Sequence, residues 1–301
     1  MKVKVKVKKL KIAALLLIGG VLLSEMALRL IGIVDFPIYV IDDKGHYSLK
    51  SDQSGNFLNK NKWFVNSLGF NNENEIDTTQ PYIFLTGDSV VYGGNPIDYY
   101  DRIGQQLEKY IDKTVYVGAL GGWSLYNELD FINKNIDIAK KSDFIIIQYD
   151  NGDLEGYAKS NGGLVHPTHQ PYSATLYTLE KYILPKILKS SNQSELPPIP
   201  EDIKNNGDWR NQLLALSKDT GKKIIFVLYP DQKGFSSPEL WNKQTEDIKS
   251  FISENPSQFS YIDIAEAKGW SLNLYRDGIH PNTQGNKLVA FEIANYLKKQ
   301  S

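Results

Sequence analysis

The chain has 301 residues, of which 41% are hydrophobic and none is cysteine, and its formal net charge is −1. This length and apolar content suffice for a globular core, and the lack of cysteine excludes disulfides and thiol chemistry without deciding the compartment. The charge is uneven, because the first eleven residues contain six lysines and no acidic residue. The remainder carries 28 basic and 35 acidic residues, a balance of −7, which argues against a nucleic-acid groove.

Residues 12–34 form an apolar segment directly after the lysines. As a helix these 23 residues would span roughly 35 Å, enough to cross a bilayer core of about 30 Å, so the sequence predicts a single-pass signal anchor. The charged residues Glu25 and Arg29 are spaced i and i+4 and can pair near the outer end of the segment. The lysines predict that the tail, residues 1–11, is cytoplasmic and the rest of the chain extracytoplasmic. A cleaved signal peptide and a secreted protein are the alternative, although no small-residue cleavage site follows Ser24.

Residues 35–76 are mixed and polar and predict a juxtamembrane extension that packs on the main domain, residues 77–301. In that domain short apolar runs alternate with amphipathic stretches, the pattern of an α/β fold. Three of the runs are nearly unbroken, as expected of strands covered on both faces. The predicted strands are residues 82–86, 114–119, 144–149, 223–229 and 259–264.

Helical periodicity occupies most of the intervals between these strands. The predicted helices are residues 97–111, 125–140, 173–190, 203–219, 238–254 and 282–299. Repeated strand–helix units predict a three-layer α/β/α sandwich around a five-stranded parallel sheet, with ligands at the carboxyl ends of the strands. Residues 155–202 interrupt the repeat with loop-like composition around one helix, and we interpret them as an insertion near those ends.

Polar or glycine-rich turns follow the first three predicted strands, in the segments Gly87–Ser89, Gly118–Ser124 and Asp150–Gly156. A fourth polar turn, "DGIHPN", follows the last strand and contains Asp277 and His280. Because the carboxyl ends of parallel strands meet at one edge of a sheet, we expect these turns to form a single site.

The residue types in these turns suit nucleophilic catalysis. A serine hydroxyl becomes a good nucleophile when a neighbouring base takes its proton and a third group orients that base. Ser89, His280 and Asp277 supply these three parts. Ester cleavage also needs donors for the developing oxyanion, and the same loops offer amides and an asparagine.

These motifs resemble the SGNH (GDSL-type) hydrolases, through "TGDSVVYGG" and Asp-x-x-His in "DGIHPNTQG". The resemblance covers residues 82–301 and implies a flavodoxin-like sandwich, with Ser89, His280 and Asp277 as the catalytic triad. It further implies an oxyanion hole formed by the amides of Ser89 and Gly122 and the side chain of Asn151. Where the family usually has Gly-x-Asn-Asp, this chain has "YDNGDLEG". The α/β-hydrolase fold is disfavoured, because position 91 is valine and the Gly-x-Ser-x-Gly elbow is missing.

Other readings of single motifs are weaker. Asp88 adjoins Ser89, but adjacent residues on such a turn point apart, so we assign it an ordering role. His166 and His169 have a spacing that could hold a metal, but no acidic or cysteine partner accompanies them, so a polar loop near the cleft is expected. No nucleotide-binding glycine motif occurs at Gly93 and Gly94, and neither a metal nor another cofactor is predicted.

The sequence therefore predicts a membrane-anchored serine esterase, such as a carbohydrate O-deacetylase. The anchor and the "VNSLGF" motif resemble membrane-tethered members of the family associated with surface polysaccharides, so an acetylated surface carbohydrate is the candidate substrate. The same triad would serve a polysaccharide O-acyltransferase, which would need a multi-spanning partner to deliver the acyl donor. A non-catalytic polysaccharide-binding or assembly protein is the third alternative, suited by the 18 tyrosines. We expect Tyr92, Trp123, Tyr149 and the insertion to wall the cleft.

Overall fold

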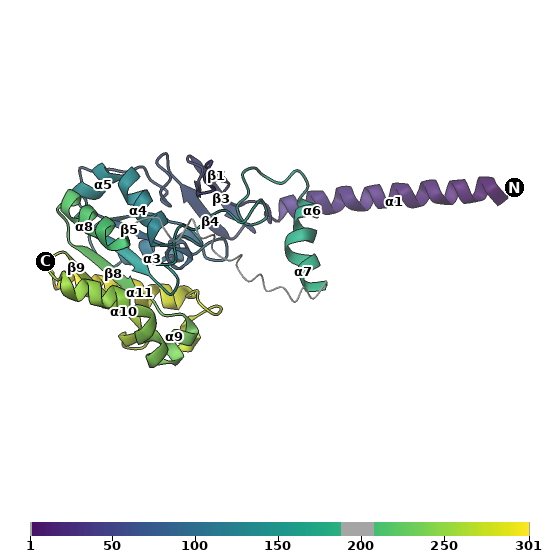
Figure 1. Cartoon of the computed structure of the whole chain (residues 1–301). Helices are drawn as coiled ribbons and strands as arrows, with labels where there is room; N and C mark the ends of the chain where they lie inside the picture. Colours follow the sequence, from purple (N-terminus) through teal and green to yellow (C-terminus); the bar gives the residue numbers. More distant parts are fainter. Residues whose placement is uncertain (1, 188–207, 301) are drawn as a thin grey trace.

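A five-stranded parallel sheet forms the centre of the main domain, in the order β6-β5-β7-β8-β9. The computed structural model describes residues 2–187 and 208–300 (Figure 1). The predicted fold class is confirmed, and each strand lies within a residue or two of its expected position because unbroken apolar runs mark doubly covered strands. The strands are β5 (Tyr82–Gly87), β6 (Thr114–Ala119), β7 (Phe144–Tyr149), β8 (Ile224–Leu228) and β9 (Phe259–Asp263).

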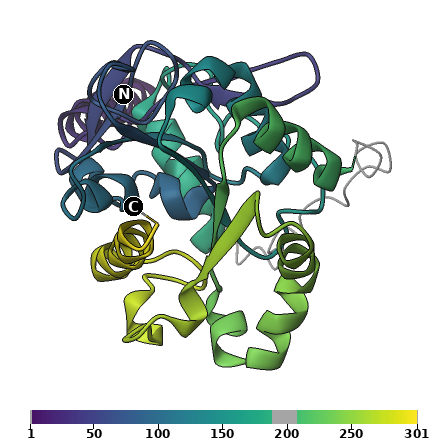
Figure 2. The same ribbon diagram turned by 90° about the vertical axis from the view of Figure 1, so that its left-hand side faces the viewer.

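Two hydrophobic cores lie on opposite faces of this sheet, as the alternation of side chains along a strand requires. In β5, Ile83 and Leu85 belong to one core, whereas Tyr82 and Phe84 belong to the other. The first core is covered by α3 (Ile103–Glu108) and α11 (Thr283–Lys298). The second is covered by α4 (Leu125–Lys134), α5 (Ile136–Lys141), α8 (Trp209–Thr220) and α10 (Pro238–Glu254). The view of Figure 2 separates α11 and α10, in yellow and light green, on either side of the sheet.

Several predicted helices are shorter or divided. The helix expected at 97–111 is a 3-10 turn, Tyr99–Asp101, followed by α3, and the one expected at 125–140 divides at Asn135 into α4 and α5. The helix expected at 173–190 is formed by α6 (Ala174–Thr178), a π-helical turn (Leu179–Ile183) and α7 (Leu184–Ile187). Its last residues, the start of the helix expected at 203–219 and the end of the predicted insertion lie outside the described residues.

The remaining elements are short and lie in the connections. They are α2 (Ser89–Tyr92), α9 (Gln232–Ser236) and two 3-10 turns, Ile264–Glu266 and Leu272–Leu274. The first of these helices follows β5 directly, and the last turn precedes the segment with Asp277 and His280.

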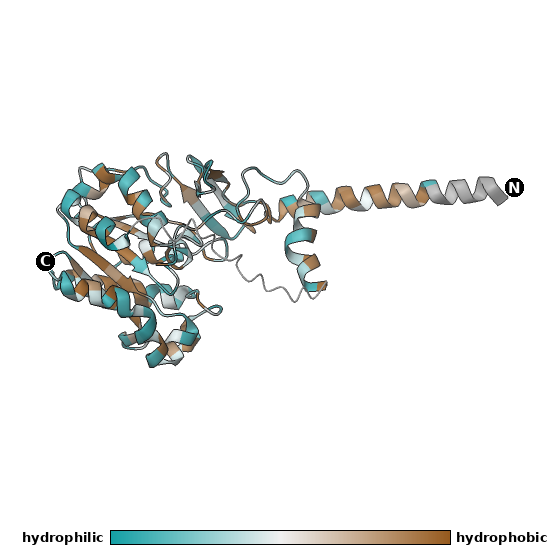
Figure 3. Ribbon diagram, viewed as in Figure 1, coloured by the Kyte–Doolittle hydropathy of each residue, from teal (hydrophilic) through white to brown (hydrophobic). Residues whose placement is uncertain are grey.

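The N-terminal helix α1 (Lys2–Leu30) projects away from the domain (Figure 1). Its segment Lys11–Leu30 is long and apolar enough to cross a membrane, by length and composition, and none of that segment is buried inside the protein (Figure 3). The helix ends before the expected boundary at residue 34, because the chain turns at Gly32 with φ +75°. Val34 is then buried in the first core, so it belongs to the domain and not to the apolar helix.

The extension after α1 forms two antiparallel hairpins. These are β1 (Tyr39–Ile41) with β2 (Tyr47–Leu49), and β3 (Gln53–Phe57) with β4 (Asn61–Val65). Their inward side chains, including Tyr47, Phe57 and Trp63, join the first core. The extension thus packs on the main domain through a hydrophobic face that its mixed composition did not reveal.

Candidate active site

Ser89 lies where the buried strand β5 passes into α2. The side chain of Asp88 caps that helix by accepting a hydrogen bond from the amide of Val90 at 2.7 Å. Asp88 thereby fixes the turn, the ordering role expected for it. Ser89 is half-buried at the resulting corner, and its Oγ atom lies 3.2 Å from Oδ2 of Asp88.

Three side chains from opposite ends of the domain meet at this corner. Nε2 of His280 lies 2.9 Å from Oγ of Ser89. Nδ1 of the same ring lies 2.9 Å from both carboxylate oxygens of Asp277. The structure therefore brings Ser89, His280 and Asp277 into one hydrogen-bonded chain, with the spacing that proton transfer from the serine to the imidazole requires.

The carboxylate of Asp277 is held in its ionised form by its own loop. Partial burial raises the pKa of Asp277, but hydrogen bonds from the amides of His280 and Ile279, together with the imidazole, lower that pKa to about 2. Oδ1 accepts from these amides at 2.9 Å and 3.1 Å. An ionised carboxylate at this place can orient the imidazole and stabilise its protonated form.

The loop of residues 277–280 is itself fixed to the end of β8. The hydroxyl of Tyr229 donates to the carbonyl of Ile279 at 2.8 Å, and the amide of Gln232 donates to the carbonyl of Gly278 at 2.9 Å. These contacts place the imidazole over the sheet edge although the loop belongs to a distant part of the sequence.

Arg276 is a further residue of the site that the sequence analysis did not identify. Its guanidinium donates to the carbonyl of Gly93, in the loop after α2, at 3.0 Å, and its Nε atom lies 3.5 Å from Asp277. Arg276 therefore connects the loop of the candidate acid to the loop of the candidate nucleophile. An arginine beside the Asp-x-x-His motif was the only signal available in the sequence.

The glycine turn after β6 lies beside the candidate nucleophile. A Cβ atom at Gly121 would stand 3.8 Å from Cβ of Ser89, and Gly122 follows with φ +78°. The hydroxyl of Tyr47 donates to the carbonyl of Gly121 at 2.9 Å and so braces the turn from the extension. Within the described part of the chain no hydrogen bond engages the amides of Ser89 and Gly122, which are the two backbone donors predicted for an oxyanion.

Asn151 occupies the exposed turn after β7. The turn lies at the same edge of the sheet as Ser89, because β7 pairs with β5 in parallel. The neighbouring Asp150 is instead buried. Asn151, the predicted third oxyanion donor, therefore lies at the same sheet edge as Ser89 and has an exposed side chain.

A cluster of four buried carboxyl groups lies behind the site, formed by Asp88, Glu128, Asp150 and Asp153. Burial raises the pKa of Glu128 well above its ordinary value, and the charges of Asp88 and Asp150 raise it further. Burial likewise raises the pKa of Asp150 and of Asp153. The raised pKa values favour the protonated form of these carboxyl groups, because several buried like charges cannot be ionised together. Sequence analysis missed the cluster because Glu128 lies within α4, where a glutamate is ordinarily exposed to solvent.

The aromatic side chains expected along the cleft have another role. Tyr92, Trp123 and Tyr149 are each less than a tenth exposed and pack in the two cores, so they do not form exposed walls of a cleft at Ser89, although Trp123 also lines a separate cavity. Bulky rings near a sheet edge are favoured in the core because each removes a large apolar area from water.

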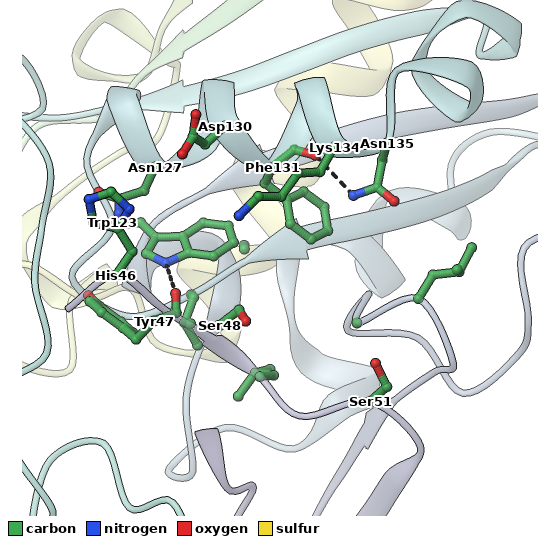
Figure 4. A pocket seen from close by; sticks show the side chains of 15 residues that line it. His46, Tyr47, Ser48, Ser51, Trp123, Asn127, Asp130, Phe131, Lys134 and Asn135 are labelled. Atoms are coloured by element: carbon green, nitrogen blue, oxygen red, sulfur yellow. Dashed lines mark hydrogen bonds between the residues drawn. The ribbon is translucent and has the colours of Figure 1, made fainter. Parts of the chain in front are cut away.

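A cavity of about 250 Å³ lies on the other side of the glycine turn, between β2 and α4 (Figure 4). It is lined by Trp123, Phe131 and Lys134 from one side and by His46 and Ser48 from the other. Neither Ser89 nor His280 lines this cavity.

The two histidines of "HPTH" do not form a common site. His166 is buried and stacks on Tyr47 with ring centroids 3.9 Å apart, and burial lowers the pKa of His166 to about 4. His169 is exposed and lies against Tyr172. Among the described residues, no group of three or more His, Asp or Glu side chains is arranged to hold a metal ion.

No family profile matches this sequence, and no curated protein matches it. Solved structures do match. A lipolytic protein of the G-D-S-L family from Veillonella parvula is 15% identical over 72% of this chain and 98% of its own, with a TM-score of 0.41. The esterase EstA from a Pseudoalteromonas species is 15% identical over 73% of this chain and 97% of its own, with a TM-score of 0.42.

The C-terminal catalytic domain of peptidoglycan O-acetyltransferase A from Streptococcus pneumoniae is 12% identical over 73% of this chain and 94% of its own, with a TM-score of 0.40. At these identities, the roles of individual residues in this chain rest on its own geometry. The solved structures similar to this chain include a putative SGNH hydrolase from Slackia heliotrinireducens and G-D-S-L lipolytic proteins, which carry the name of the family that its motifs resemble.

Proposed function

We propose that this protein is a serine ester hydrolase whose nucleophile is Ser89. The observation that carries the proposal is the continuous chain of contacts from Asp277 through His280 to Ser89, each at 2.9 Å. A structural serine at a helix start would need no imidazole at its hydroxyl, and a structural histidine would need no paired carboxylate.

In the proposed reaction, Oγ of Ser89 attacks the ester carbonyl while Nε2 of His280 accepts the hydroxyl proton. The imidazolium then gives this proton to the leaving alcohol as the carbon–oxygen bond of the ester breaks, which leaves an acyl group on Ser89. Water attacks the acyl-enzyme with His280 again as base, and release of the acid restores the serine. Asp277 holds the ring and stabilises its positive charge throughout.

Backbone amides of Ser89 and Gly122 and the side chain of Asn151 are the proposed donors to the oxyanion. The first two come from the start of α2 and from a turn whose backbone lies beside the nucleophile. Such donors stabilise the charge that develops on the carbonyl oxygen, and each contributes about 100-fold to 1,000-fold in rate.

We further propose that α1 anchors the protein in a membrane, with the catalytic domain on the extracytoplasmic side. The exposed apolar surface of Lys11–Leu30 supports an anchor, and the basic N-terminus supports the orientation. An acyl ester of a surface carbohydrate, such as an acetyl ester, is the proposed substrate class.

The first experiment measures p-nitrophenol release from p-nitrophenyl acetate by the full chain in detergent micelles. Ser89→Ala and His280→Ala are expected to lose roughly 10⁴-fold to 10⁶-fold in kcat. Ser257→Ala and His169→Ala, which replace an exposed serine and an exposed histidine elsewhere, are the matched controls and should retain full activity.

Covalent labelling by a fluorophosphonate probe provides a second measurement that needs no correct guess of the acyl acceptor. The probe should label the unmodified chain and both controls, and fail to label Ser89→Ala. Equal labelling of all variants would refute Ser89 as the nucleophile. Labelling without ester hydrolysis would support Ser89 as the nucleophile but indicate that the acyl group is transferred to an acceptor other than water, such as a sugar hydroxyl. Such a transferase would need an acyl-donating partner.

A further inference from the structure

Residues 174–187, which comprise α6, the π-helical turn and α7, form a continuous helical segment beside the outer part of α1. We call this the crossing segment. Glu25 of α1 accepts hydrogen bonds from the hydroxyl of Ser173 and from the amides of Ala174 and Thr175, at 2.9 to 3.0 Å. An acidic residue of the apolar helix thus caps the crossing segment, which gives the charged residue a role.

Arg29 completes this junction. Its Nε atom lies 2.7 Å from Glu25, and its terminal nitrogen donates to the carbonyls of Pro171 and Tyr172 at 3.0 and 3.1 Å. Both members of the charged pair within the apolar helix are therefore hydrogen-bonded to protein groups. Such hydrogen bonding is what charged side chains require where water is scarce.

The crossing segment has two apolar faces. On one, Tyr177 is 5% exposed and its ring lies 5.1 Å from that of Phe36, in the core of the domain. On the other, four large aliphatic side chains at helical spacing remain exposed. These are Leu176 (53%), Leu179 (38%), Ile183 (42%) and Ile187 (68%). A monomeric soluble domain rarely leaves such a stripe in water.

The direction of the segment indicates what covers this stripe. Figure 1 shows α6 and α7 running across the axis of α1, not along it. If α1 lies along the membrane normal, the crossing segment lies parallel to the membrane surface. Near the junction, Met26 (56%) and Leu30 (69%) of α1 are exposed apolar residues too.

We propose that the crossing segment is an interfacial helix, with Leu176, Leu179, Ile183 and Ile187 buried in the outer leaflet of the bilayer. This inference rests on the membrane anchoring proposed for α1. The junction at Glu25 lies five residues before the end of α1, about 8 Å along the helix, which matches the depth of roughly 5–10 Å at which amphipathic helices lie. Tyr172, 91% exposed just before the segment, suits the headgroup layer in which tyrosine is enriched.

The interfacial helix would also restrict the rotation of the catalytic domain relative to the membrane. A helix fixed both in the lipid and, through Tyr177, in the core prevents the domain from turning freely about the end of α1. The loop before the segment also reaches the site: the carbonyl of Pro167 accepts from the amide of Tyr39, and His166 stacks on Tyr47, which braces the glycine turn. The interfacial helix therefore sets the orientation of the candidate active site relative to the membrane.

Site-directed spin labelling of the full chain tests this arrangement, and the absence of native cysteine makes single labels unambiguous. Leu176→Cys and Ile183→Cys place a nitroxide on the stripe. Leu272→Cys, 49% exposed in the 3-10 turn after β9, is the matched aqueous control, and Leu16→Cys, 72% exposed in α1, reports on the anchor. Each variant is reconstituted in vesicles of phosphatidylcholine and phosphatidylglycerol.

Collisions with molecular oxygen, which concentrates in lipid, are compared with collisions with a water-soluble nickel chelate. Labels at positions 176 and 183 are expected to collide mainly with oxygen and little with the nickel chelate, as the label at position 16 should. The label at position 272 should collide mainly with the nickel chelate. Lipid contact at 16 with nickel access at both 176 and 183 would overturn the interfacial helix but leave the anchor. Nickel access at 16 would refute the anchor itself.

Discussion

Nε2 of His280 lies 2.9 Å from Oγ of Ser89, although 191 positions of sequence separate the two residues. One belongs to the turn after β5 in the middle of the sheet, and the other to the loop after the edge strand β9. The contact exists because Tyr229, directly after β8, and Gln232, the first residue of α9, hold the histidine loop over the sheet edge. Given this contact, substitutions can test which residue is the triad acid, which side chain donates to the oxyanion and how the buried carboxyl groups affect stability.

Asp277 is the triad acid in the proposed mechanism. Asp88, which precedes Ser89 in the sequence, is not. Asp277→Asn should lower kcat by roughly 10⁴-fold, because an amide cannot stabilise the imidazolium and favours the wrong tautomer. Asp88→Asn keeps an oxygen that can cap α2 and should lose far less. The measurement is the steady-state hydrolysis of p-nitrophenyl acetate; a larger loss in Asp88→Asn would reverse the assignment.

Asn151 should act on the transition state if it donates to the oxyanion. Asn151→Ala is expected to lower kcat by about 100-fold to 1,000-fold with little change in KM. Asn133→Ala, at an exposed position of α4, provides the control. Unchanged kcat in Asn151→Ala would show that the two backbone amides suffice.

Gly87 has no room for a side chain at the base of the nucleophile turn. A Cβ atom there would lie 2.6 Å from Cγ2 of Val91 and 2.8 Å from Oε1 of Gln148, so Gly87→Ala must displace these buried side chains at the nucleophile turn. We expect a loss of about 1–3 kcal/mol in the free energy of unfolding. Urea unfolding measures it, with Gly163→Ala as the control, since nothing lies within 4 Å of a Cβ atom at Gly163. Equal stability of the two variants would contradict the packing argument.

The buried carboxyl cluster should make stability depend on pH. Because burial and the neighbouring acidic residues raise the folded-state pKa of Glu128, its contribution to stability is fully present below its ordinary value of 4.5. That contribution is lost as the pH rises through the raised pKa. Glu128→Gln removes the titration and should flatten the fall in the free energy of unfolding as the pH rises above 4.5. Glu246→Gln, an exposed position, should leave the fall unchanged; a fall that persists undiminished in Glu128→Gln would exclude Glu128 as a source.

The strands could be predicted because their signal is local. Nearly unbroken apolar runs such as Phe144–Tyr149 identify a strand covered on both faces. Four of the five strands begin at the predicted residue, and β8 begins one residue later than predicted. Helix ends were less predictable. The helix expected to continue to residue 34 ends at Leu30, because Gly32 adopts a left-handed conformation that lets Val34 enter the core.

Burial, in contrast, depends on what the rest of the chain places nearby. Aromatic residues such as Trp123 and Tyr149 are typical of sugar-binding clefts, but here both are buried in a hydrophobic core. Only the packed structure distinguishes these two environments. For the same reason Glu128 gave no signal, since a glutamate in a helix is ordinarily solvated, and its three acidic neighbours come from two other segments.

The sequence by itself determined the α/β class, the apolar N-terminal helix and the residues Ser89, Asp277 and His280, because strand patterns and short motifs are properties of contiguous residues. The tertiary structure decided the order of the strands, the approach of His280 to Ser89, the brace from Tyr47, the link through Arg276 and the capping of the crossing segment by Glu25. Each of these joins residues far apart in the chain, and such contacts form only when the hydrophobic cores on both faces of the sheet fix the loops in space.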